Sequence, residues 1–420
     1  MLEMTVVQRT AWMLERTMNG PLAGIRIIEV AMWAFVPAAG GMLADMGATV
    51  LKIEPPTGDP LRGLRVGTSQ PGDHGFVLSW ESYNRGKQSI TLDLRQTAGQ
   101  DIFYSLLEDA DVLLTNLLPS ARRRMGISVE QVRARYPDII YALGSGVGAQ
   151  GPEADKGGYD AISYWARAGI ASSLTAESAD YPLPPPGPAF GDTTAAAMLA
   201  GGVAAAVAQR LMTGHAPVVD VSLLATGMWQ MQRSISEATL GESGSRKVPR
   251  DQVNNPLVNT YRTLDGRFIA LCMLQSQRYW APFCLAADRT DLADDPRFAQ
   301  DSDRRRNVGA CVAELDALFA GKSLADWRQI LARQEGQWDI VQNVAELADD
   351  PQVRANRYIQ PVDYGAGRIM PMVSTPIQFD GSPLAPRPAP ALGENSEEIL
   401  TALGYSEDEI IGLKVADVVF

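Results

Sequence analysis

The stretch FGDTTAA, residues 190–196, places a single carboxylate at the start of a long apolar run. Gly191 would let a ligand approach the backbone closely, and Asp192 would lie where the amides and dipole of a helix N-terminus favour negative charge. Aspartate is also a preferred N-cap residue, so the spacing alone favours a capping role for Asp192. The two roles are compatible, because an ionised carboxylate can attack an activated carbonyl that is held against it.

Other kinds of catalytic site find little support among the remaining residues. The chain has two histidines, His74 and His215, and no serine in a nucleophile elbow, which argues against a Ser-His-Asp triad. Its three cysteines lack the spacing of metal ligands, so we expect no metal site. Residues 31–41, AMWAFVPAAGG, lack the G-x-G-x-x-G pattern of nicotinamide and flavin dinucleotide sites. Of the kinds of catalysis considered, catalysis by a carboxylate is the one that remains.

Length, composition and charge favour a cytoplasmic protein of two domains. At 420 residues the chain exceeds what one hydrophobic core usually covers, and 46% hydrophobic with 20% charged residues are ordinary values. The net charge of -12 argues against a nucleic-acid partner, which needs a broad basic face. The longest apolar stretch, residues 194–208, is shorter than the roughly 20 residues of a membrane span, so we expect a buried helix. We expect a cytoplasmic location because no secretory leader is recognisable.

Strand and helix patterns alternate through the first third of the chain. Pro37 is expected in the first turn of one helix, and Ser128 at the N-cap of another. Such alternation predicts a parallel, doubly wound sheet, whose ligands bind beyond the carboxyl ends of the strands. The predicted strands are 24–30, 48–54, 89–94, 111–116 and 138–146, and the predicted helices are 37–47, 97–110 and 128–137.

The pattern changes after about residue 255 and indicates a second, smaller α+β domain. Residues 259–274 have the pattern of a hairpin that turns at Asp265 and Gly266, and helical spacing follows over about 275–335. The expected segments are an N-terminal extension (1–20), a large domain (21–215), a linker (216–255), a small α+β domain (256–365), and a second linker with the C-terminal segment (366–420).

Five segments together carry a resemblance to a known family. Residues 21–62, NRGKQSITLDL, LLTNLLPSARRRMGIS, GGYDAISYWARAG and FGDTTAA resemble the family III coenzyme A transferases in order and spacing. That family includes formyl-CoA, carnitine-CoA and succinyl-CoA transferases and the related α-methylacyl-CoA racemases. The resemblance implies a large Rossmann-like domain whose C-terminal segment returns to it, a small domain, and two subunits interlocked as rings. It also implies coenzyme A esters as substrates, with no permanently bound cofactor.

The resemblance assigns the chemistry to three residues. Asp192 matches the nucleophile, which forms an aspartyl anhydride with the acyl group and then an aspartyl-CoA thioester. Asp160 matches the acidic position that assists this nucleophile, with a helix-capping or solvated aspartate as the alternative. Tyr159 stands where the racemases have histidine, and a tyrosine is a poor general base at neutral pH. CoA transfer is therefore favoured, with 2-methylacyl-CoA isomerisation and CoA binding without catalysis as alternatives.

The same resemblance implies contacts to CoA and to the acyl group. Arginine suits phosphate because its donors are bidentate. Arg122 and Arg123 add local positive charge that an acidic protein otherwise lacks, with a solvated helix face as the favoured alternative for each. Trp33 and Phe35 are expected in an acyl pocket, with core packing as the alternative, and Ala34 replaces the glutamine of the formyl-CoA enzyme, which argues against formyl-CoA as the substrate. The expected CoA contacts are Leu92, Arg95, Asn116, Leu117, Ala121 and Arg124.

Overall fold

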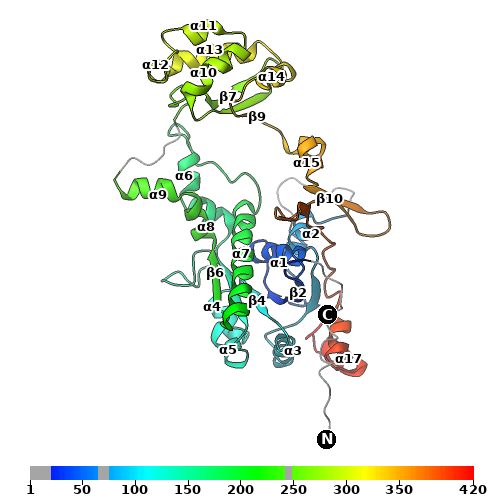
Figure 1. Cartoon of the computed structure of the whole chain (residues 1–420). Helices are drawn as coiled ribbons and strands as arrows, with labels where there is room; N and C mark the ends of the chain where they lie inside the picture. The colour runs from blue at the N-terminus through cyan, green and yellow to red at the C-terminus, as the bar shows by residue number, and fades with distance from the viewer. Residues whose placement is uncertain (1–19, 65–74, 242–247) are drawn as a thin grey trace. The chain divides into compact units, whose positions relative to one another are not determined.

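The computed structural model describes residues 20–64, 75–241 and 248–420 and divides the chain into two compact units (Figure 1). Nearly all of the expected N-terminal extension, residues 1–19, and the histidine at position 74 lie outside the described residues. Unit 1 comprises Met1–Thr175, Asp180–Ser245 and Gln352–Phe420, and unit 2 comprises Ala176–Ala179 and Arg246–Pro351.

The core of unit 1 is a six-stranded parallel sheet in the order β3-β2-β1-β4-β5-β6. This is the order of a doubly wound fold, in which the strand order reverses between β1 and β4. The parallel sheet predicted from the alternating pattern is confirmed. Its strands are β1 (Arg26–Val30), β2 (Thr49–Glu54), β3 (Gln88–Thr91), β4 (Val112–Thr115), β5 (Ile140–Ser145) and β6 (Val218–Ser222).

Strand β6 lies in the segment 216–255 that the sequence predicted as a linker. It pairs in parallel with β5. A parallel neighbour needs a crossover of about a dozen residues or more, and the 24-residue helix α7 (Phe190–Thr213) lies between the two strands in the chain. Part of the expected linker is therefore the last strand of the sheet.

Helices cover both faces of this sheet, which explains why its strands are apolar on both sides. In β1, Ile27 packs in the cluster that contains α1 (Phe35–Asp45) and α7, whereas Ile28 packs in a second cluster with α3 (Thr97–Leu107). The other helical segments of the sheet region are η2 (Pro60–Arg62), α2 (Leu78–Asn84), α4 (Pro119–Arg124), α5 (Val129–Arg135), the π-helix η3 (Asp160–Ala166), α6 (Ile170–Leu174), α8 (Leu223–Gln230) and α9 (Gln232–Thr239).

Helix α7 is, within the described residues, the one helix long and apolar enough to cross a membrane by length and composition, with a mean hydropathy of 1.4. Those two properties are weak evidence, because a core helix shares them. Ala195, Leu199 and Val203 are fully buried in the cluster shared with α1. The apolar run thus supplies one covering layer of the sheet.

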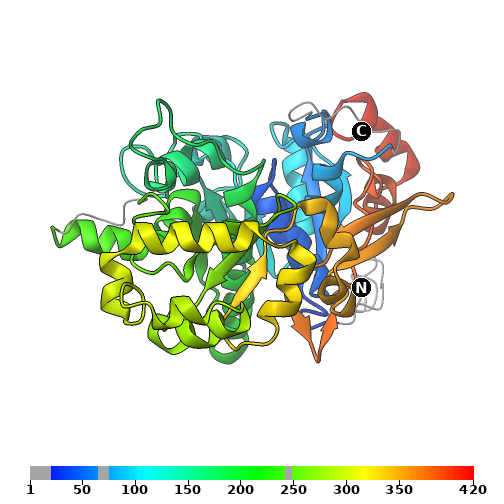
Figure 2. The same ribbon diagram turned by 90° about the horizontal axis from the view of Figure 1, so that it is seen from above.

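The C-terminal segment returns to unit 1 and covers the edge strand β3, as the red and blue segments of Figures 1 and 2 show. Asn395 exchanges two hydrogen bonds with the backbone of Ser89, at 2.9 and 3.1 Å, and the Phe420 N–H donates to Thr91 Oγ1 at 2.7 Å. This covering protects an otherwise open sheet edge. The elements of the segment are α15 (Pro351–Ala355), β10 (Ile359–Asp363), β11 (Ile369–Val373), β12 (Gln378–Phe379), β13 (Ser382–Pro383), α16 (Ser396–Ala402) and α17 (Glu407–Val415).

Unit 2 contains the predicted hairpin and the predicted helices. Arg262 pairs with Phe268 across the turn that holds Asp265 and Gly266, and a third antiparallel strand, which the sequence did not predict, extends the sheet. Stacked aromatic rings such as Phe319 and Trp327, at 4.3 Å, fill its core. The elements are β7 (Val258–Arg262), β8 (Phe268–Cys272), α10 (Ser276–Ala286), α11 (Thr290–Asp294), α12 (Asp301–Arg306), α13 (Val308–Ala320), α14 (Leu324–Leu331), β9 (Trp338–Ile340) and the 3₁₀-helix η4 (Val344–Asp349).

Two mid-helix glycines provide a matched test of the packing of unit 1. A Cβ at Gly40 in α1 would lie 2.0 Å from Glu29 Oε2 and 3.1 Å from Lys87 Nζ, whereas a Cβ at Gly201 in α7 meets nothing within 4 Å. Gly40→Ala should lower the free energy of unfolding by about 1 to 3 kcal/mol, as overpacking does. Gly201→Ala should raise it by about 0.5 to 1 kcal/mol, because alanine favours the helix. Urea unfolding measures both, and equal effects would contradict the packing described.

Candidate active site

A cavity of about 320 Å³ lies beyond the carboxyl ends of β4 and β5, beside the point where the strand order reverses. This is the position at which doubly wound sheets bind ligands. Asp192 and Tyr159 both line it. A second cavity of about 80 Å³ continues along the ends of β1, β2 and β3 and shares Met32 and Leu117 with the first. The two cavities together follow the carboxyl edge of the sheet.

The predicted capping role of Asp192 is wrong. Helix α7 begins at Phe190, so that Asp192 is its third residue, and the N-cap is Ala189 with φ +57°. The side chain of Asp192 makes no cap hydrogen bond, and its carboxylate accepts no hydrogen bond from the described residues. The helix therefore positions Asp192 in its first turn without using the carboxylate to satisfy its free N–H groups.

Asp160 lies beside the start of α7 but does not cap that helix either. It begins the π-helix η3 and is buried, and its Oδ1 has no hydrogen-bond partner within the described residues, although the nearby backbone N–H groups of Gly191 and Phe190 favour its charged form. Burial nevertheless outweighs these donors and raises the pKa of Asp160 above its ordinary value. The start of α7 thus lies against a carboxylate from another element.

Gly191 is required by protein packing. A Cβ at this position would lie 2.3 Å from the ring of Tyr164 and 2.6 Å from Asp160 Oδ1. Any larger residue would separate α7 from η3. The expectation that Gly191 opens the backbone to a ligand is replaced by this closer constraint, which brings Asp160 and Asp192 together.

The charge state of Asp192 follows from this arrangement. Burial, and after it the negative charge of Asp160, raise the pKa of Asp192 to about 7. Burial and the charges of both aspartates also raise the pKa of Tyr83. Tyr83 is therefore a neighbour of the pair that sequence reasoning missed, since it comes from α2, far away in the chain. At neutral pH Asp192 is divided between acid and carboxylate.

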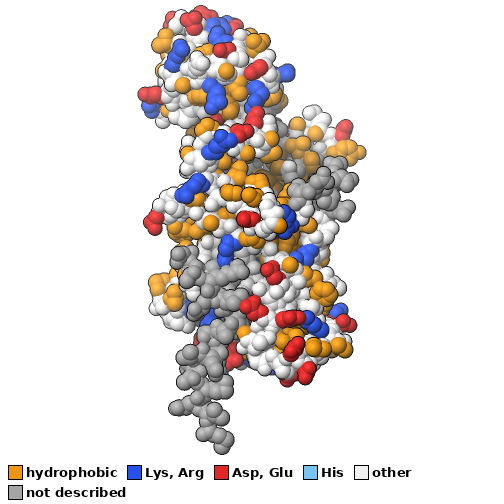
Figure 3. All heavy atoms as spheres, turned by 90° about the vertical axis from the view of Figure 1, so that its right-hand side faces the viewer, with side chains coloured by type: hydrophobic (Ala, Val, Ile, Leu, Met, Phe, Trp, Pro, Cys, Tyr) orange, Lys and Arg blue, Asp and Glu red, His pale blue; other side chains and the backbone are white. Residues whose placement is uncertain are grey.

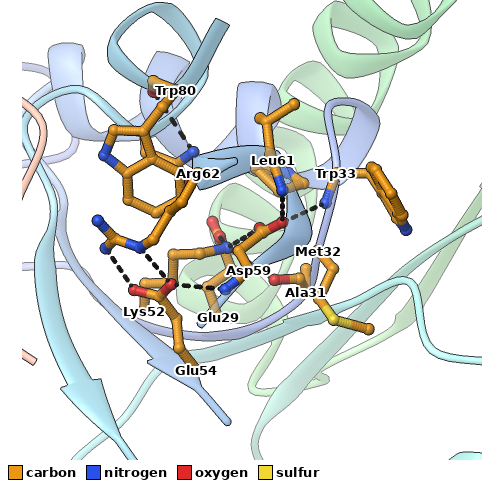
Figure 4. A network of polar contacts seen from close by, with 12 residues as sticks. Glu29, Ala31, Met32, Trp33, Lys52, Glu54, Asp59, Leu61, Arg62 and Trp80 are labelled. Carbon is orange, nitrogen blue, oxygen red and sulfur yellow. Dashed lines mark hydrogen bonds and ion pairs between the residues drawn. The ribbon is translucent and has the colours of Figure 1, made fainter. Parts of the chain in front are cut away.

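Two of the three residues expected in the acyl pocket line the cavity, and the third does not. Trp33 and Phe35 line the larger cavity, whereas Ala34 is buried as the N-cap of α1 and is not among the lining residues. The ring of Trp33 lies edge-to-face on Tyr159, with centroids 5.6 Å apart. Trp33 also has φ +69°, a left-handed conformation that costs a bulky residue roughly 1 to 2 kcal/mol. Figure 4 shows the polar contacts beneath this segment.

The expected CoA contacts are spread along the carboxyl edge. Leu92 and Arg95 line the smaller cavity, Asn116 and Ala121 the larger one, and Leu117 lines both. The amide of Asn116 is already engaged with the backbone of the first loop, and Arg95 is paired with a neighbouring aspartate at 2.8 Å.

Of the three consecutive arginines in α4, Arg122 is the one that lines the cavity. It is only 8% exposed, and its Nε has no hydrogen-bond partner within the described residues. Arg123 and Arg124 are exposed and line neither cavity. The interpretation of Arg122 as part of a solvated face is therefore wrong. Its spacing of three residues from Pro119, another lining residue, is a signal that could have identified it.

The described part of the chain contains no group of three or more His, Cys, Asp and Glu side chains that could hold a metal ion. On the face shown in Figure 3, lysine and arginine side chains are scattered among acidic ones. The charged residues that line the cavity are instead one carboxylate, Asp192, and two cations, Arg122 and Lys156.

The raised pKa of Asp192 makes a prediction about stability. In the unfolded chain this carboxyl ionises near 3.8, so between about pH 4 and pH 7 the folded protein holds a proton that the unfolded chain has lost. The stability lost through Asp192 therefore accumulates between about pH 4 and pH 7 and is complete above pH 7. Asp192→Asn should be more stable than the parent by on the order of 1 to 3 kcal/mol at pH 8, and the gain should shrink at pH 5. Urea unfolding at both pH values measures this.

A matched variant separates the two causes. Asp160→Asn keeps the shape of the side chain but removes the charge beside Asp192. The pKa of Asp192 should then fall, and the pH window of the stability gain should move down with it. A gain for Asp192→Asn that is equal at pH 5 and pH 8 would contradict a buried, raised carboxyl.

Comparison with known proteins places this site in a family. The model of CoA-transferase family III matches residues 22–396. The chain is 30% identical over 399 residues to (R)-2-hydroxy-4-methylpentanoate CoA-transferase of Clostridioides difficile, covering 95% of this chain and 99% of that protein. It is also 30% identical over 391 residues to cinnamoyl-CoA:phenyllactate CoA-transferase of Clostridium sporogenes, covering 92% and 94%.

A solved structure agrees with these sequences. A CaiB/BaiF family protein from Brucella suis superimposes with a TM-score of 0.77 at 27% identity and covers 92% of this chain and all of that one. The family match extends over most of the chain and includes every residue of both cavities. The chain belongs to CoA-transferase family III.

Proposed function

We propose that this protein transfers coenzyme A from an acyl-CoA thioester to a carboxylic acid, with Asp192 as the covalent nucleophile. The observation that carries the proposal is a carboxylate without a hydrogen-bond donor among the described residues, with its pKa raised to about 7, on the wall of a cavity at the carboxyl edge of the sheet. The names of the two relatives, both CoA-transferases, support the reaction class.

In the proposed course, a carboxylate oxygen of Asp192 attacks the thioester carbonyl, the C–S bond breaks, and CoA leaves as thiolate. The thiolate then attacks the Asp192 carbonyl of the resulting anhydride, which releases the first acid and leaves an aspartyl-CoA thioester. The acceptor carboxylate repeats both steps in reverse and restores Asp192. Atoms and charge balance at each step without a net proton, and covalent catalysis divides one difficult exchange into easier ones.

Asp160 and Tyr159 have supporting roles in this proposal. The charge of Asp160 raises the pKa of Asp192 and so makes its carboxylate a stronger nucleophile once ionised. Tyr159, which is 56% exposed and lines the cavity, contacts the acyl group together with Trp33. No histidine lies among the lining residues, so the structure offers no specific support for isomerisation.

The acyl group is proposed to be medium-sized and apolar. Met32, Trp33, Phe35 and Leu223 contribute apolar surface to the cavity that Asp192 lines. The two relatives are named for 2-hydroxy-4-methylpentanoate and for cinnamoyl-CoA with phenyllactate, which are acids with apolar side chains. A screen of branched and aromatic CoA esters against 2-hydroxy acids, followed by mass spectrometry, identifies the pair.

The proposal includes a cytoplasmic homodimer of interlocked rings. The side chains of Leu211 and Met212 at the end of α7 are 75% and 78% exposed, and that of Trp229 on α8 is 60% exposed. Apolar exposure of this size is typical of a surface that a second subunit covers. The three cysteines are free thiols, which is consistent with a reducing compartment.

The nucleophile is tested by Asp192→Asn, which keeps the shape of the side chain but removes the attacking oxygen. Transfer should fall by more than about 1000-fold, a barrier increase of roughly 4 kcal/mol, while CoA still binds. Hydroxylamine added during turnover of the parent should modify the peptide that contains FGDTTAA. Freshly prepared variant is required, because deamidation would restore Asp192.

Two outcomes would overturn the assignment. One is a variant that retains more than about a tenth of the parent rate, a barrier change below roughly 1.4 kcal/mol. The other is exchange of the α-hydrogen with solvent deuterium in the absence of any acceptor acid, which would favour the isomerase alternative.

The anion contacts are tested by three neighbouring substitutions. Arg122→Gln should weaken CoA binding by about tenfold or more, because a buried guanidinium that meets a phosphate contributes roughly 1.5 to 3 kcal/mol. Arg124→Gln should cost less than about fivefold, since an exposed charge is screened by solvent. Arg123→Gln, on the same helix but outside both cavities, is the control. Calorimetry measures the three dissociation constants, and an equal loss for Arg122 and Arg123 would remove Arg122 from the site.

A further inference from the structure

Trp33 is held in its unusual conformation by a buried carboxylate. Its backbone has φ +69°, a region that bulky residues rarely adopt. Its N–H donates to Asp59 Oδ1 at 3.1 Å, and the same oxygen accepts from the N–H of Leu61 at 2.9 Å. This conformation directs the Trp33 ring edge-to-face against Tyr159, on the wall of the cavity that Asp192 lines.

The two residues before Trp33 are fixed as firmly. The amide of Asn116 accepts from the Met32 N–H at 3.0 Å and donates to the Met32 carbonyl at 2.6 Å. The carbonyl of Ala31 accepts from Lys52 Nζ at 2.7 Å. Three consecutive residues of the first loop are thus bound by side chains from three separate segments of unit 1. Figure 4 shows two of these side chains, Lys52 and Asp59, beside the loop.

Asp59 is itself fixed by a buried network of balanced charge. Lys52 forms ion pairs of 3.1 Å with both Asp59 and Glu29, and all three side chains are fully buried. Burial opposes the charge of Lys52, but the carboxylates around it outweigh burial and raise its pKa. The network contains equal numbers of carboxylates and cations, namely Glu29, Glu54 and Asp59 with Lys52, Arg62 and Lys87.

We propose that Asp59 is a positioning residue for substrate selection: through its bond to the Trp33 N–H it fixes Trp33 against Tyr159, and this aromatic pair forms a rigid wall that favours an apolar acyl group. The inference rests on the proposed function, in which the acyl group occupies this cavity. Asp59 itself is buried and does not line either cavity, so it acts only through the loop.

A double-mutant cycle tests the proposal by binding alone. All proteins carry Asp192→Asn, so that the thioester is not consumed, and calorimetry gives the dissociation constants of CoA and isovaleryl-CoA. Asp59→Ala should reduce the preference for isovaleryl-CoA over CoA by roughly tenfold, comparable to the loss of one or two methylene contacts. Trp33→Gly should lose the preference as well, because glycine tolerates the positive φ but removes the ring. Asp59→Ala should then add nothing in the Trp33→Gly background.

The control is another buried carboxylate of unit 1. Asp45 is paired with Arg85 at 2.8 Å and accepts a hydrogen bond from Thr375 at 2.6 Å, and it lines neither cavity. Asp45→Ala should lower stability but leave the ratio of the two dissociation constants unchanged. Asp59→Asn should also preserve the ratio, because its amide oxygen can still accept from the Trp33 N–H.

Several results would overturn the positioning role. They are an unchanged ratio in Asp59→Ala, an equal change in Asp45→Ala, or an effect of Asp59→Ala that persists without Trp33. Should Asp59→Ala not fold, Asp59→Ser replaces it. The side chain of serine is one atom shorter than that of aspartate, but its oxygen can still accept from the Leu61 N–H and cap that turn. Failure of the transferase proposal would be seen separately, as transfer that survives Asp192→Asn.

Discussion

Two aspartates meet at the first turn of α7, Asp192 within that turn and Asp160 from the start of η3. The nearby backbone N–H groups of Gly191 and Phe190 partly offset the effect of burial on the pKa of Asp160, whereas burial and the charge of Asp160 raise the pKa of Asp192 without such an offset. This unequal division keeps a partly buried carboxyl near its point of half-ionisation at neutral pH. The close contact at Gly191, which leaves no room for a Cβ beside Tyr164 and Asp160, enforces the arrangement.

The first loop, which forms another part of the cavity wall, differs from Asp192 in how its buried charges are paired. Beneath the first loop, every buried charge has a partner, and carboxylates and cations balance. A buried ion pair contributes little net stability compared with apolar packing, but breaking one is costly, so such a network fixes geometry more than it stabilises the fold. It fixes the loop that carries Trp33. The cavity thus combines a wall held by a network of balanced charge with a carboxylate, Asp192, that has no cation paired with it among the described residues.

The sequence predicted the elements whose signal is local. Apolar runs and alternation located five of the six strands of the parallel sheet, and the hairpin at Asp265 and Gly266 followed from its turn residues. It did not predict β6 or β9, which are short and defined by the strands beside them. At the site, it selected Asp192 and Asp160 but favoured a capping role for Asp192 that the structure does not have, and for Arg122 it favoured a solvated face although the side chain is buried. Those errors share one cause, since the partner of a buried polar group is set by tertiary contacts.

The different surroundings of the two aspartates are what nucleophilic chemistry requires. A carboxylate that accepts two or three backbone N–H bonds has a low pKa, because those bonds stabilise its charge, and the same stabilisation makes it a weak nucleophile. Had Asp192 capped α7, it would have been ionised but unreactive. Because Asp192 is the third residue of α7 and makes no cap hydrogen bond, the helix can hold it in place while leaving its oxygens free for a substrate carbonyl. The helix therefore serves to position Asp192, and Asp192 does not serve to cap the helix.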